Sequence, residues 1–472
     1  MASARAPKLA LARAVGALSR LGGGGGTSAP GKVLMRLDPA AIAALGARLP
    51  HGSVLVSATN GKTTTTSMIA AILEREGIAL VHNHAGANMA GGVAAALLAA
   101  TRPRGQIAGE LGLFEVDELW LDTVAAQLHP RAILLGNLFR DQLDRFGELE
   151  AIAERWAAGL EADRLVLNAD DPLVADLGRE RADTLYFGVE DGSLALPGMA
   201  HAADATHCRR CGAPYAFAAI YLGHLGHYRC PSCGRARPTP TVTAGDVRLE
   251  GVRAARFTLR TPAGEAEVAL GLPGLYNVYN ALAAAALATA LEVPLESILA
   301  GLHTARAAFG RAETVMLSGV RAHAGAPDDR RSAPPRQLRI LLVKNPVGAN
   351  EVLRTLALEP GEHDLLGVLN DNIADGRDIS WIWDADFELL AGRIRRLTCS
   401  GTRAAELALR LKYAGVDPLR ISVQPDLSRA LRAAAEDRPD DTAPLYALPT
   451  YTAMRSLREL LIARGEVSSA WS

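Results

Sequence analysis

Short apolar runs alternate with longer stretches of helical periodicity between residues 51 and 200. This alternation is typical of a parallel sheet covered by crossover helices. A second, shorter series of the same kind begins at Leu338. The strands predicted in the first series are Ser53–Val56, Ile78–Val81, Gln106–Phe114, Ala132–Leu135, Leu165–Leu167 and Thr184–Phe187. Those of the second are Leu338–Val343, Leu365–Leu369, Arg396–Cys399, Arg420–Val423 and Leu445–Ala447. The pattern predicts two doubly wound α/β domains, the second one smaller.

Between the two series the pattern changes twice. A Cys- and His-rich insert at about 201–240 interrupts the first series, which resumes with strand-like runs to Ala269 and an Ala-rich helix from Asn277 to about Leu291. Residues 319–337 are polar, Pro-rich and aperiodic, which favours a surface linker. We therefore expect an N-terminal helical or flexible segment (1–50), a central domain (51–318), the linker (319–337) and a C-terminal domain (338–472).

Composition narrows the class of protein. The chain has 472 residues, 49% of them hydrophobic, and a net charge of −1. The hydrophobic share is sufficient for several buried cores. The net charge near zero gives no overall electrostatic attraction to nucleic acid. No apolar run approaches the roughly 18–20 residues that span a bilayer. Residues Lys8–Leu21 have the pattern of a basic amphipathic helix, which we expect to pack on the first domain; contact with a membrane surface stays open.

Only five lysines occur in the chain, and one of them, Lys62, lies in the stretch Ala58–Thr64. A predicted strand precedes this stretch, and a predicted helix from Thr65 to Glu76 follows it. Strand, tight turn and helix N-terminus form the context of a phosphate-binding loop, in which backbone N–H groups and a lysine face the anion. The long form of this loop has a glycine where Val56 stands. The predicted nucleotide-binding residues are Thr59, Asn60, Gly61, Lys62, Thr63 and Thr64, with the Thr63 hydroxyl as a ligand of Mg²⁺.

Four of the five cysteines form two Cys-x-x-Cys pairs, Cys208 with Cys211 and Cys230 with Cys233. Two such pairs at this distance predict one zinc ion held by four thiolates. A site with four protein ligands has no open position, so we expect a structural role. His207, His224 and His227 are predicted to be polar loop residues, with replacement of a cysteine by one of them as the alternative. A redox pair is the weaker interpretation, and Cys399 is predicted to be a small buried residue.

Polar clusters follow three of the predicted strands. Glu115 ends the strand before Val116-Asp117-Glu118, and strand C-termini line the ligand crevice of a doubly wound sheet. Glu115 is therefore a predicted Mg²⁺ ligand, and Glu110 is a weaker candidate. Asn137–Gly147 and Asn168–Asp171 occupy the corresponding places after two other strands.

Together these motifs resemble the Mur ligase family, ATP-dependent enzymes that form amide bonds in peptidoglycan precursors. The matching segments are ATNGKTTTT (58–66), FEVDE (114–118), NLFRDQLDRFGE (137–148), LNADDP (167–172), GLYNVYNALAA (274–284) and FGRAE (309–313). The resemblance implies that Asn277 and Asn280 lie near the adenine and that Arg311 lies near the phosphates.

Two departures and the C-terminal segments refine this resemblance. Amino-acid-adding Mur ligases use a carbamoylated lysine in the central domain, but no lysine occurs between Lys62 and Lys344, and Gln142 stands where they usually have histidine. These departures and the four-cysteine insert are similar to the MurT branch of the family. So are KNPVGANEVL (344–353), NDNIADGRDISWIWDADFE (370–388), SGTRAAELALRLKYAG (400–415) and LPTYTAM (448–454).

The MurT resemblance implies a glutamine-hydrolysing amidotransferase that converts the D-glutamate α-carboxylate of lipid II to D-isoglutamine through an acyl phosphate. ATP, Mg²⁺ and structural Zn²⁺ are the implied cofactors. Ammonia would come from a GatD-type glutaminase in a heterodimer, at the inner face of the cytoplasmic membrane. The motif match places Asp378 beside that partner's catalytic dyad, with Asp375 and Asp371 as weaker candidates. A stand-alone Mur or folylpolyglutamate-type ligase and a non-catalytic nucleotide-binding scaffold are the alternatives.

Overall fold

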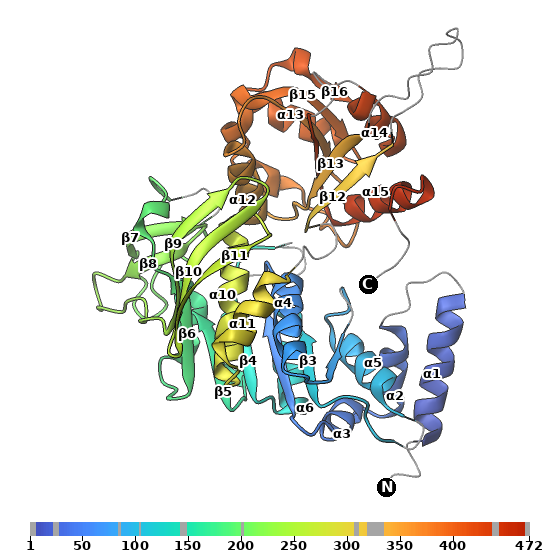
Figure 1. Ribbon diagram of the computed structural model, residues 1–472, viewed down its shortest axis with the longest axis vertical. Coiled ribbons are helices and arrows are strands. Elements are labelled where there is room, and N and C mark those ends of the chain that lie inside the picture. The colour runs from blue at the N-terminus through green and yellow to red at the C-terminus, as the bar shows by residue number, and fades with distance from the viewer. Residues whose placement is uncertain are drawn as a thin grey trace.

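The computed structural model describes residues 6–21, 28–83, 86–102, 105–141, 149–199, 203–305, 311–318, 335–436 and 443–467. These residues form two α/β units, each built on its own sheet, and a small two-stranded hairpin (Figure 1). The predicted fold class, a doubly wound phosphate-loop unit with a four-cysteine insert and a smaller C-terminal α/β unit, is confirmed.

The larger sheet has nine strands in the order β11-β10-β9-β6-β5-β4-β1-β3-β2. From β2 to β9 neighbouring strands run parallel, whereas β9, β10 and β11 are antiparallel. Its strands are β1 (Ser53–Ser57), β2 (Leu80–His82), β3 (Leu111–Glu115), β4 (Ala132–Leu135), β5 (Arg164–Asn168), β6 (Thr184–Val189), β9 (Val242–Glu250), β10 (Ala254–Thr261) and β11 (Gly264–Leu270). Since β1 lies between β3 and β4, the chain leaves β1 where the strand order reverses, the usual position of a ligand crevice.

Helices cover both faces of this sheet and bury one core on each. The first core packs against α4 (Lys62–Arg75), α10 (Leu275–Ala290) and α11 (Leu295–His303). The second face carries α1 (Ala6–Leu21), α2 (Ala29–Leu37), α3 (Ala41–Gly46), α5 (Ala90–Ala100), α6 (Leu121–Leu128), α8 (Leu149–Gly159) and α9 (Pro172–Ala175). The predicted packing of the N-terminal helix is confirmed, since Ala12 of α1 is fully buried and Arg13 donates to the Leu98 carbonyl.

The smaller sheet has six strands in the order β12-β13-β17-β14-β15-β16. All neighbours run parallel except β12 and β13. The strands are β12 (Arg311–Leu317), β13 (Arg336–Leu341), β14 (His363–Val368), β15 (Ile394–Ser400), β16 (Ile421–Val423) and β17 (Leu445–Pro449). Helices α12 (Pro346–Ala357) and α13 (Ala404–Tyr413) cover one face, and α14 (Leu427–Glu436) and α15 (Tyr451–Ala463) cover the other.

Short elements complete the two units. They are the hairpin strands β7 (Ala216–Leu222) and β8 (Leu225–Arg229) and the 3₁₀ helices η1 (Asp176–Gly178), η2 (Gly192–Leu194), η3 (Ser380–Trp383), η4 (Phe387–Arg393) and η5 (Pro418–Arg420). Among the described residues, no helix combines the length and apolarity that crossing a membrane requires.

Several predicted boundaries are wrong. β12 pairs with β13 of the smaller sheet, so residues 311–317 do not belong to the central unit, and Arg336 and Gln337 belong to β13 rather than to the linker. A polar segment between two strands of one sheet had the same pattern as a linker between domains. α4 begins at Lys62 instead of Thr65, because the loop geometry overrides the low helix propensity of threonine. Residues 319–334 of the predicted linker lie outside the described residues.

Candidate functional site

The turn between β1 and α4 has the geometry of a phosphate-binding loop. Gly61 precedes α4 with φ of 89°, a left-handed conformation that side chains with a Cβ rarely adopt. A Cβ on Gly61 would also lie 2.0 Å from Oδ1 of Asn280. Glycine is therefore required here both by the backbone and by the close approach of α10. The first N–H groups of α4, from Lys62 to Thr64, belong to the helix end that attracts anions.

Lys62 is buried beside carboxylates rather than extended into solvent. Its Nζ lies 2.8 Å from Oε2 of Glu118 and also donates to the Ala58 carbonyl. Burial lowers the pKa of Lys62, but Glu118, then Glu115 and Asp117, raise it above its ordinary value. The ammonium group is therefore charged and is neutralised by Glu118. The sequence did not single out Glu118 as the partner of Lys62, although Glu118 closes the FEVDE motif.

Glu115 lies where the sequence predicted, at the end of β3. In the parallel register it neighbours Val56 of β1, just before the phosphate loop. Asn83 fixes its backbone from both sides, because the Asn83 amide accepts from the Glu115 N–H at 2.9 Å and donates to its carbonyl at 2.8 Å. Glu115, Asp117 and Glu118 are all buried, and Glu118 is already paired with Lys62.

Glu110, the weaker candidate, is excluded by its position. It precedes β3 at the opposite end of the sheet, where its carboxylate accepts from the Ala79 N–H at 3.0 Å. The predicted strand was too long at its start, because apolar residues before Leu111 continue the pattern without joining the sheet.

The segment after β4 binds the phosphate loop. The Asn137 side chain accepts from the Asn60 N–H at 2.9 Å and donates to the Asn60 carbonyl at 3.0 Å. Thr59 Oγ1 accepts from the Phe139 N–H at 3.0 Å. Asp141 accepts from Lys344, which enters from the smaller unit. The polar cluster predicted after β4 thus holds the loop in place, while Gln142 lies outside the described residues.

The smaller unit also contacts the loop directly. The side chains of Asn60 and Asn345 donate to each other at 3.3 and 2.9 Å. Asn345 is the N-cap of α12, and its Oδ1 accepts from the Gly348 N–H at 2.8 Å. Lys344 and Asn345 are site residues that sequence reasoning missed, although Asn-Pro is a helix-start signal.

α10 borders the loop on its other side. Asn280 lies against Gly61, and its Oδ1 accepts from Thr65 Oγ1 at 3.2 Å. Asn277 is linked to the loop through Asn280, whose amide donates to it at 3.1 Å. A small hollow between loop and helix is lined by residues such as Asn60, Lys62 and Asn280. Arg311 begins β12, and its side chain lies outside the described part of the chain.

The third polar cluster, after β5, stabilises the fold instead of lining the crevice. Asp171 caps α9 and accepts from the Leu138 N–H at 2.8 Å. Asp170 accepts from Tyr279 Oη at 2.6 Å and pairs with Arg237. Both carboxylates are completely buried and bound by the chain itself.

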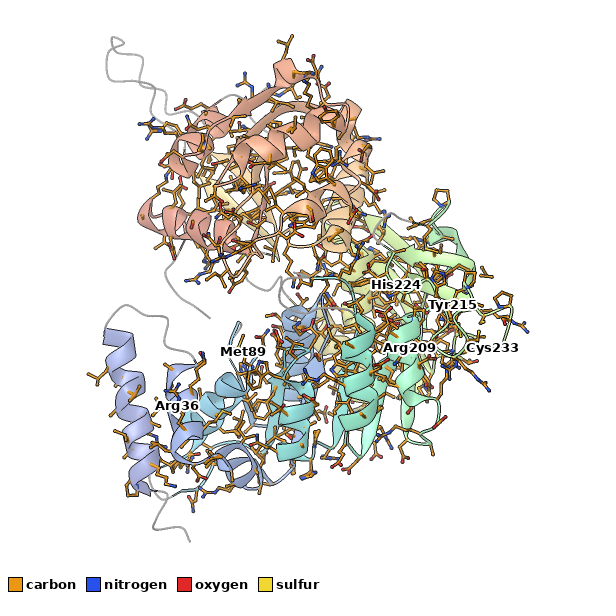
Figure 2. The ribbon with its side chains drawn as sticks, turned by 180° about the vertical axis from the view of Figure 1, so that it is seen from behind. Arg36, Met89, Arg209, Tyr215, His224 and Cys233 are labelled. Carbon is orange, nitrogen blue, oxygen red and sulfur yellow. The ribbon has the colours of Figure 1, made fainter. Side chains whose placement is uncertain are left out.

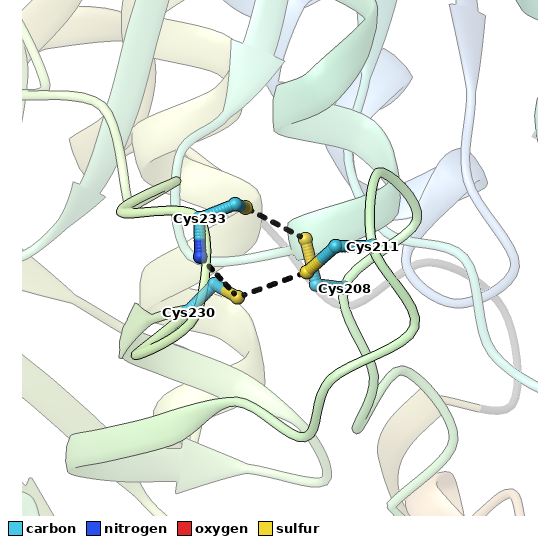
Figure 3. Close-up of side chains that lie close together, drawn as sticks. All are labelled: Cys208, Cys211, Cys230 and Cys233. Carbon is cyan, nitrogen blue, oxygen red and sulfur yellow. Dashed lines mark hydrogen bonds between the residues drawn. The ribbon is translucent and has the colours of Figure 1, made fainter.

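The four cysteines of the insert converge as predicted. Their sulfur atoms all lie within 4.8 Å of one another, with 3.6 Å between Cys208 and Cys233 and 3.4 Å between Cys211 and Cys230 (Figure 3). Burial raises the pKa of Cys208, but N–H groups of the Cys-x-x-Cys turn lower it more, to about 6. A thiolate set of this size fits one tetrahedral zinc ion.

The histidines of the insert differ from the prediction in one case. His224 is not a polar loop residue: it is completely buried, at the turn of the β7–β8 hairpin, because that turn is inserted into the core. His227 donates from Nε2 to the Val189 carbonyl oxygen at 2.9 Å. Within the described residues, the sulfur cluster includes no histidine.

Asp378 lies on the surface of the smaller unit. Its Oδ1 accepts from the Ser380 N–H at 2.8 Å, which lowers its pKa. Asp375 is buried and accepts from the Thr452 N–H at 2.7 Å, and Asp371 accepts from Thr402 at 2.8 Å. Of the three candidates, Asp378 is the exposed one that a second chain could reach.

Comparisons with known proteins agree with this geometry. The Mur ligase middle domain profile matches residues 56–228, and the MurT ligase C-terminal profile matches residues 342–454. Subunit MurT of the glutamine-hydrolysing lipid II isoglutaminyl synthase from Streptococcus pneumoniae R6 is 34% identical over 95% of this chain and 94% of its own. Its counterpart from Staphylococcus aureus N315 is 32% identical over 96% of both chains. A pseudomurein peptide ligase of Methanothermus fervidus, 23% identical with a TM-score of 0.63, covers 88% of this chain and 79% of its own and shares the fold. The chain therefore belongs to the MurT family of Mur ligases.

Proposed function

We propose that this chain is the synthetase subunit of a lipid II isoglutaminyl synthase. It would use ATP to convert the α-carboxylate of the D-glutamate in lipid II to an amide. The observation that carries the proposal is the buried Lys62–Glu118 pair at the phosphate loop, in a chain similar to MurT subunits over 95% of its length. A lysine held among three carboxylates at a helix N-terminus suits transfer of a phosphoryl group.

Activation of the carboxylate explains the need for ATP. A carboxylate resists attack by ammonia, because oxide is a poor leaving group. Its oxygen would attack the γ-phosphorus of ATP, and ADP would leave with the electrons of the broken P–O bond. Ammonia would then attack the carbonyl carbon of the acyl phosphate, releasing inorganic phosphate and a proton. The products are the amide, ADP and phosphate.

The loop residues would bind the triphosphate. The N–H groups from Gly61 to Thr64 and the Lys62 ammonium would neutralise the charge that grows on the transferred group. Thr63 and Glu115 would hold Mg²⁺, which supplies further charge neutralisation on the phosphate oxygens. Asn280, steadied by Asn277, would face the nucleoside, and Arg311 would approach the phosphates from β12.

Lys344 would supply positive charge at the acceptor, in place of the second Mg²⁺ that a carbamoylated lysine holds in amino-acid-adding Mur ligases. No lysine occurs between Lys62 and Lys344, so a carbamoylated lysine is not possible there. Lys344 is one-quarter exposed, pairs with Asp141, and lowers the pKa of Glu118, which puts its charge within range of the site. We assign it the role of orienting the acceptor carboxylate toward the γ-phosphate.

Ammonia would come from a GatD-type glutaminase bound to the smaller unit. A glutaminase needs an activated cysteine, but four of the five cysteines form the sulfur cluster, and burial raises the pKa of Cys399 to about 12. Exposed apolar side chains near Asp378 in sequence, Ile373 (73% exposed) and Trp383 (51% exposed), support a protein partner there. With a lipid-linked acceptor, the complex would act at the inner face of the cytoplasmic membrane.

The experiment separates the two half-reactions. We expect the Asp378→Asn variant, purified with the glutaminase, to lose glutamine-dependent amidation, because the partner's imidazole is no longer oriented. Amidation with ammonium chloride should stay at the wild-type rate, because the phosphate loop is unchanged. An equal loss with both nitrogen sources would refute this role of Asp378.

A further inference from the structure

The four-cysteine insert extends toward the proposed nucleotide site through its β7–β8 hairpin. The cysteine cluster lies at the open end of β7 and β8, where Ala216 pairs with Arg229. Gly223 and His224 form the turn at the other end, between the paired Leu222 and Leu225. A seven-residue strand at about 3.3 Å per residue spans roughly 20 Å. Figure 2 shows Cys233 at the outer edge of the molecule and His224 further in, toward the smaller unit.

The turn is inserted between the two units. A Cβ on Gly223, whose φ is 58°, would lie 2.9 Å from the Phe139 ring and 3.3 Å from Val347 of α12. His224 is completely buried, and Leu222 and Leu225 are 4% and 1% exposed. A hairpin that served only to hold a metal would not need to bury its far end in the main core.

His224 makes three contacts with residues that carry the site. Its ring packs on Phe139 with centroids 4.8 Å apart. Its Nδ1 accepts from the Asp204 N–H at 3.4 Å, which leaves the imidazole proton on Nε2. Nε2 lies 3.4 Å from Oδ2 of Asp171 without forming a hydrogen bond, and that oxygen accepts from the Leu138 N–H.

Leu138 and Phe139 belong to the segment that binds the phosphate loop. Phe139 exchanges hydrogen bonds with Thr59, whose Oγ1 accepts from the Phe139 N–H and donates to its carbonyl. Asn137 holds Asn60 from both sides. Hence a single residue, Phe139, separates His224 from Thr59 of the loop.

A second contact joins the start of the insert to the same segment. The Asp204 carboxylate accepts from the Arg140 N–H at 2.9 Å and pairs with the Arg140 guanidinium. Asp204 lies shortly before Cys208, so the start of the insert and the hairpin turn both contact residues 138–140. Arg140 also reaches Asp384 of the smaller unit at 3.6 Å.

We propose that the hairpin is a strut that positions the phosphate loop, with His224 as its positioning residue. Zinc at the cysteine cluster would fix the outer end of the hairpin, and His224 would hold Phe139 and Leu138 at the inner end. This inference rests on the proposed nucleotide site at Lys62. The insert would then affect ATP binding indirectly, through the phosphate loop, without touching the substrate.

The test compares His224→Ala with His227→Ala, a histidine of the same hairpin that contacts Val189 instead of Phe139. Each full-length chain is purified with its glutaminase partner. Zinc content is measured by elemental analysis, the ATP dissociation constant by calorimetry, and KM and kcat with ammonium chloride. We expect His224→Ala to keep its zinc and to bind ATP about tenfold more weakly, with KM for ATP raised accordingly. His227→Ala should bind ATP as the wild type does.

Two further perturbations complete the design. His224→Gln should recover part of the ATP affinity, because its longer side chain restores contact with Phe139. Removing zinc from the wild type with a chelator should weaken ATP binding in the same direction as His224→Ala. If His224→Ala does not fold, Gly223→Ala replaces it as the test variant. Its added methyl group would displace Phe139 and should therefore raise KM for ATP.

The outcomes are distinct. Wild-type ATP affinity in His224→Ala, or a fall in kcat with an unchanged KM, would overturn the strut. So would an equal loss of affinity in His227→Ala, or a Gly223→Ala variant with the wild-type KM. A wild-type protein that binds no ATP would instead contradict the proposed function. That result is distinct from those that overturn the strut, because they all require a wild type that binds ATP.

Discussion

Replacement of Glu118 by glutamine tests the electrostatics of the phosphate loop. In the wild type, Lys62 and Glu118 form an ion pair with side chains 9% and 3% exposed. Removing one charge of a buried pair costs about 3 kcal/mol, because the other charge stays desolvated. Glutamine retains a hydrogen bond worth about 1 kcal/mol. We therefore expect Glu118→Gln to lower the free energy of unfolding by about 2 kcal/mol, measured by urea denaturation without nucleotide.

ATP should reverse part of this loss. Its phosphates bring negative charge to a lysine that has lost its partner, so the nucleotide should stabilise Glu118→Gln more than it stabilises the wild type. The measurement uses ATP with EDTA, which removes any effect of Glu118 on Mg²⁺. An unchanged unfolding free energy, or a smaller stabilisation by ATP than in the wild type, would refute the reasoning.

The pH dependence has a defined sign. Burial raises the pKa of Glu118, but Lys62 and then Lys344 lower it below its ordinary value. A lowered folded-state pKa contributes stability that is present above the unfolded pKa of about 4.3 and lost as pH falls through the folded value. The raised pKa of Lys62 contributes stability that is present below about 10.4 and lost above it. The difference between wild type and variant should therefore persist between these limits and disappear in acid.

Three further changes have expected outcomes. Gly61→Ala should weaken ATP binding roughly tenfold in calorimetry, because a left-handed residue with a Cβ costs about 1–2 kcal/mol and its methyl group meets Asn280; a wild-type affinity would contradict the loop geometry. Lys344→Ala should lower kcat with ammonium about a hundredfold while KM for ATP changes little, and a loss confined to KM would contradict its proposed role at the acceptor. Cys211→Ser should reduce bound zinc to a small fraction of the wild-type content in elemental analysis, whereas full zinc content would exclude the four-thiolate site.

Local patterns predicted the elements and the isolated motifs well. β4 has the predicted bounds, the phosphate loop lies at the predicted turn, and the four cysteines converge. Each of these features depends on residues close in sequence, or on a ligand spacing that allows few geometries.

Contacts between distant segments were not predictable in this way. Lys62 selects Glu118, not Glu115, because of how β3 continues beyond the sheet edge, and nothing in FEVDE distinguishes the three carboxylates. The pairing of Asn60 with Asn345 depends on how the two units meet. His224 has the local pattern of an exposed hairpin turn, and only the tertiary packing of that hairpin buries it.

The central claim is that this chain and a glutaminase together amidate lipid II at the expense of ATP. The most direct measurement is mass spectrometry of lipid II after incubation of the co-purified complex with ATP, Mg²⁺ and glutamine. The account predicts that lipid II becomes lighter by the exchange of one hydroxyl for an amino group at the D-glutamate, with ADP formed in equal amount. Unchanged lipid II, with ADP formed only when an amino acid is added as acceptor, would contradict the account and favour a stand-alone ligase.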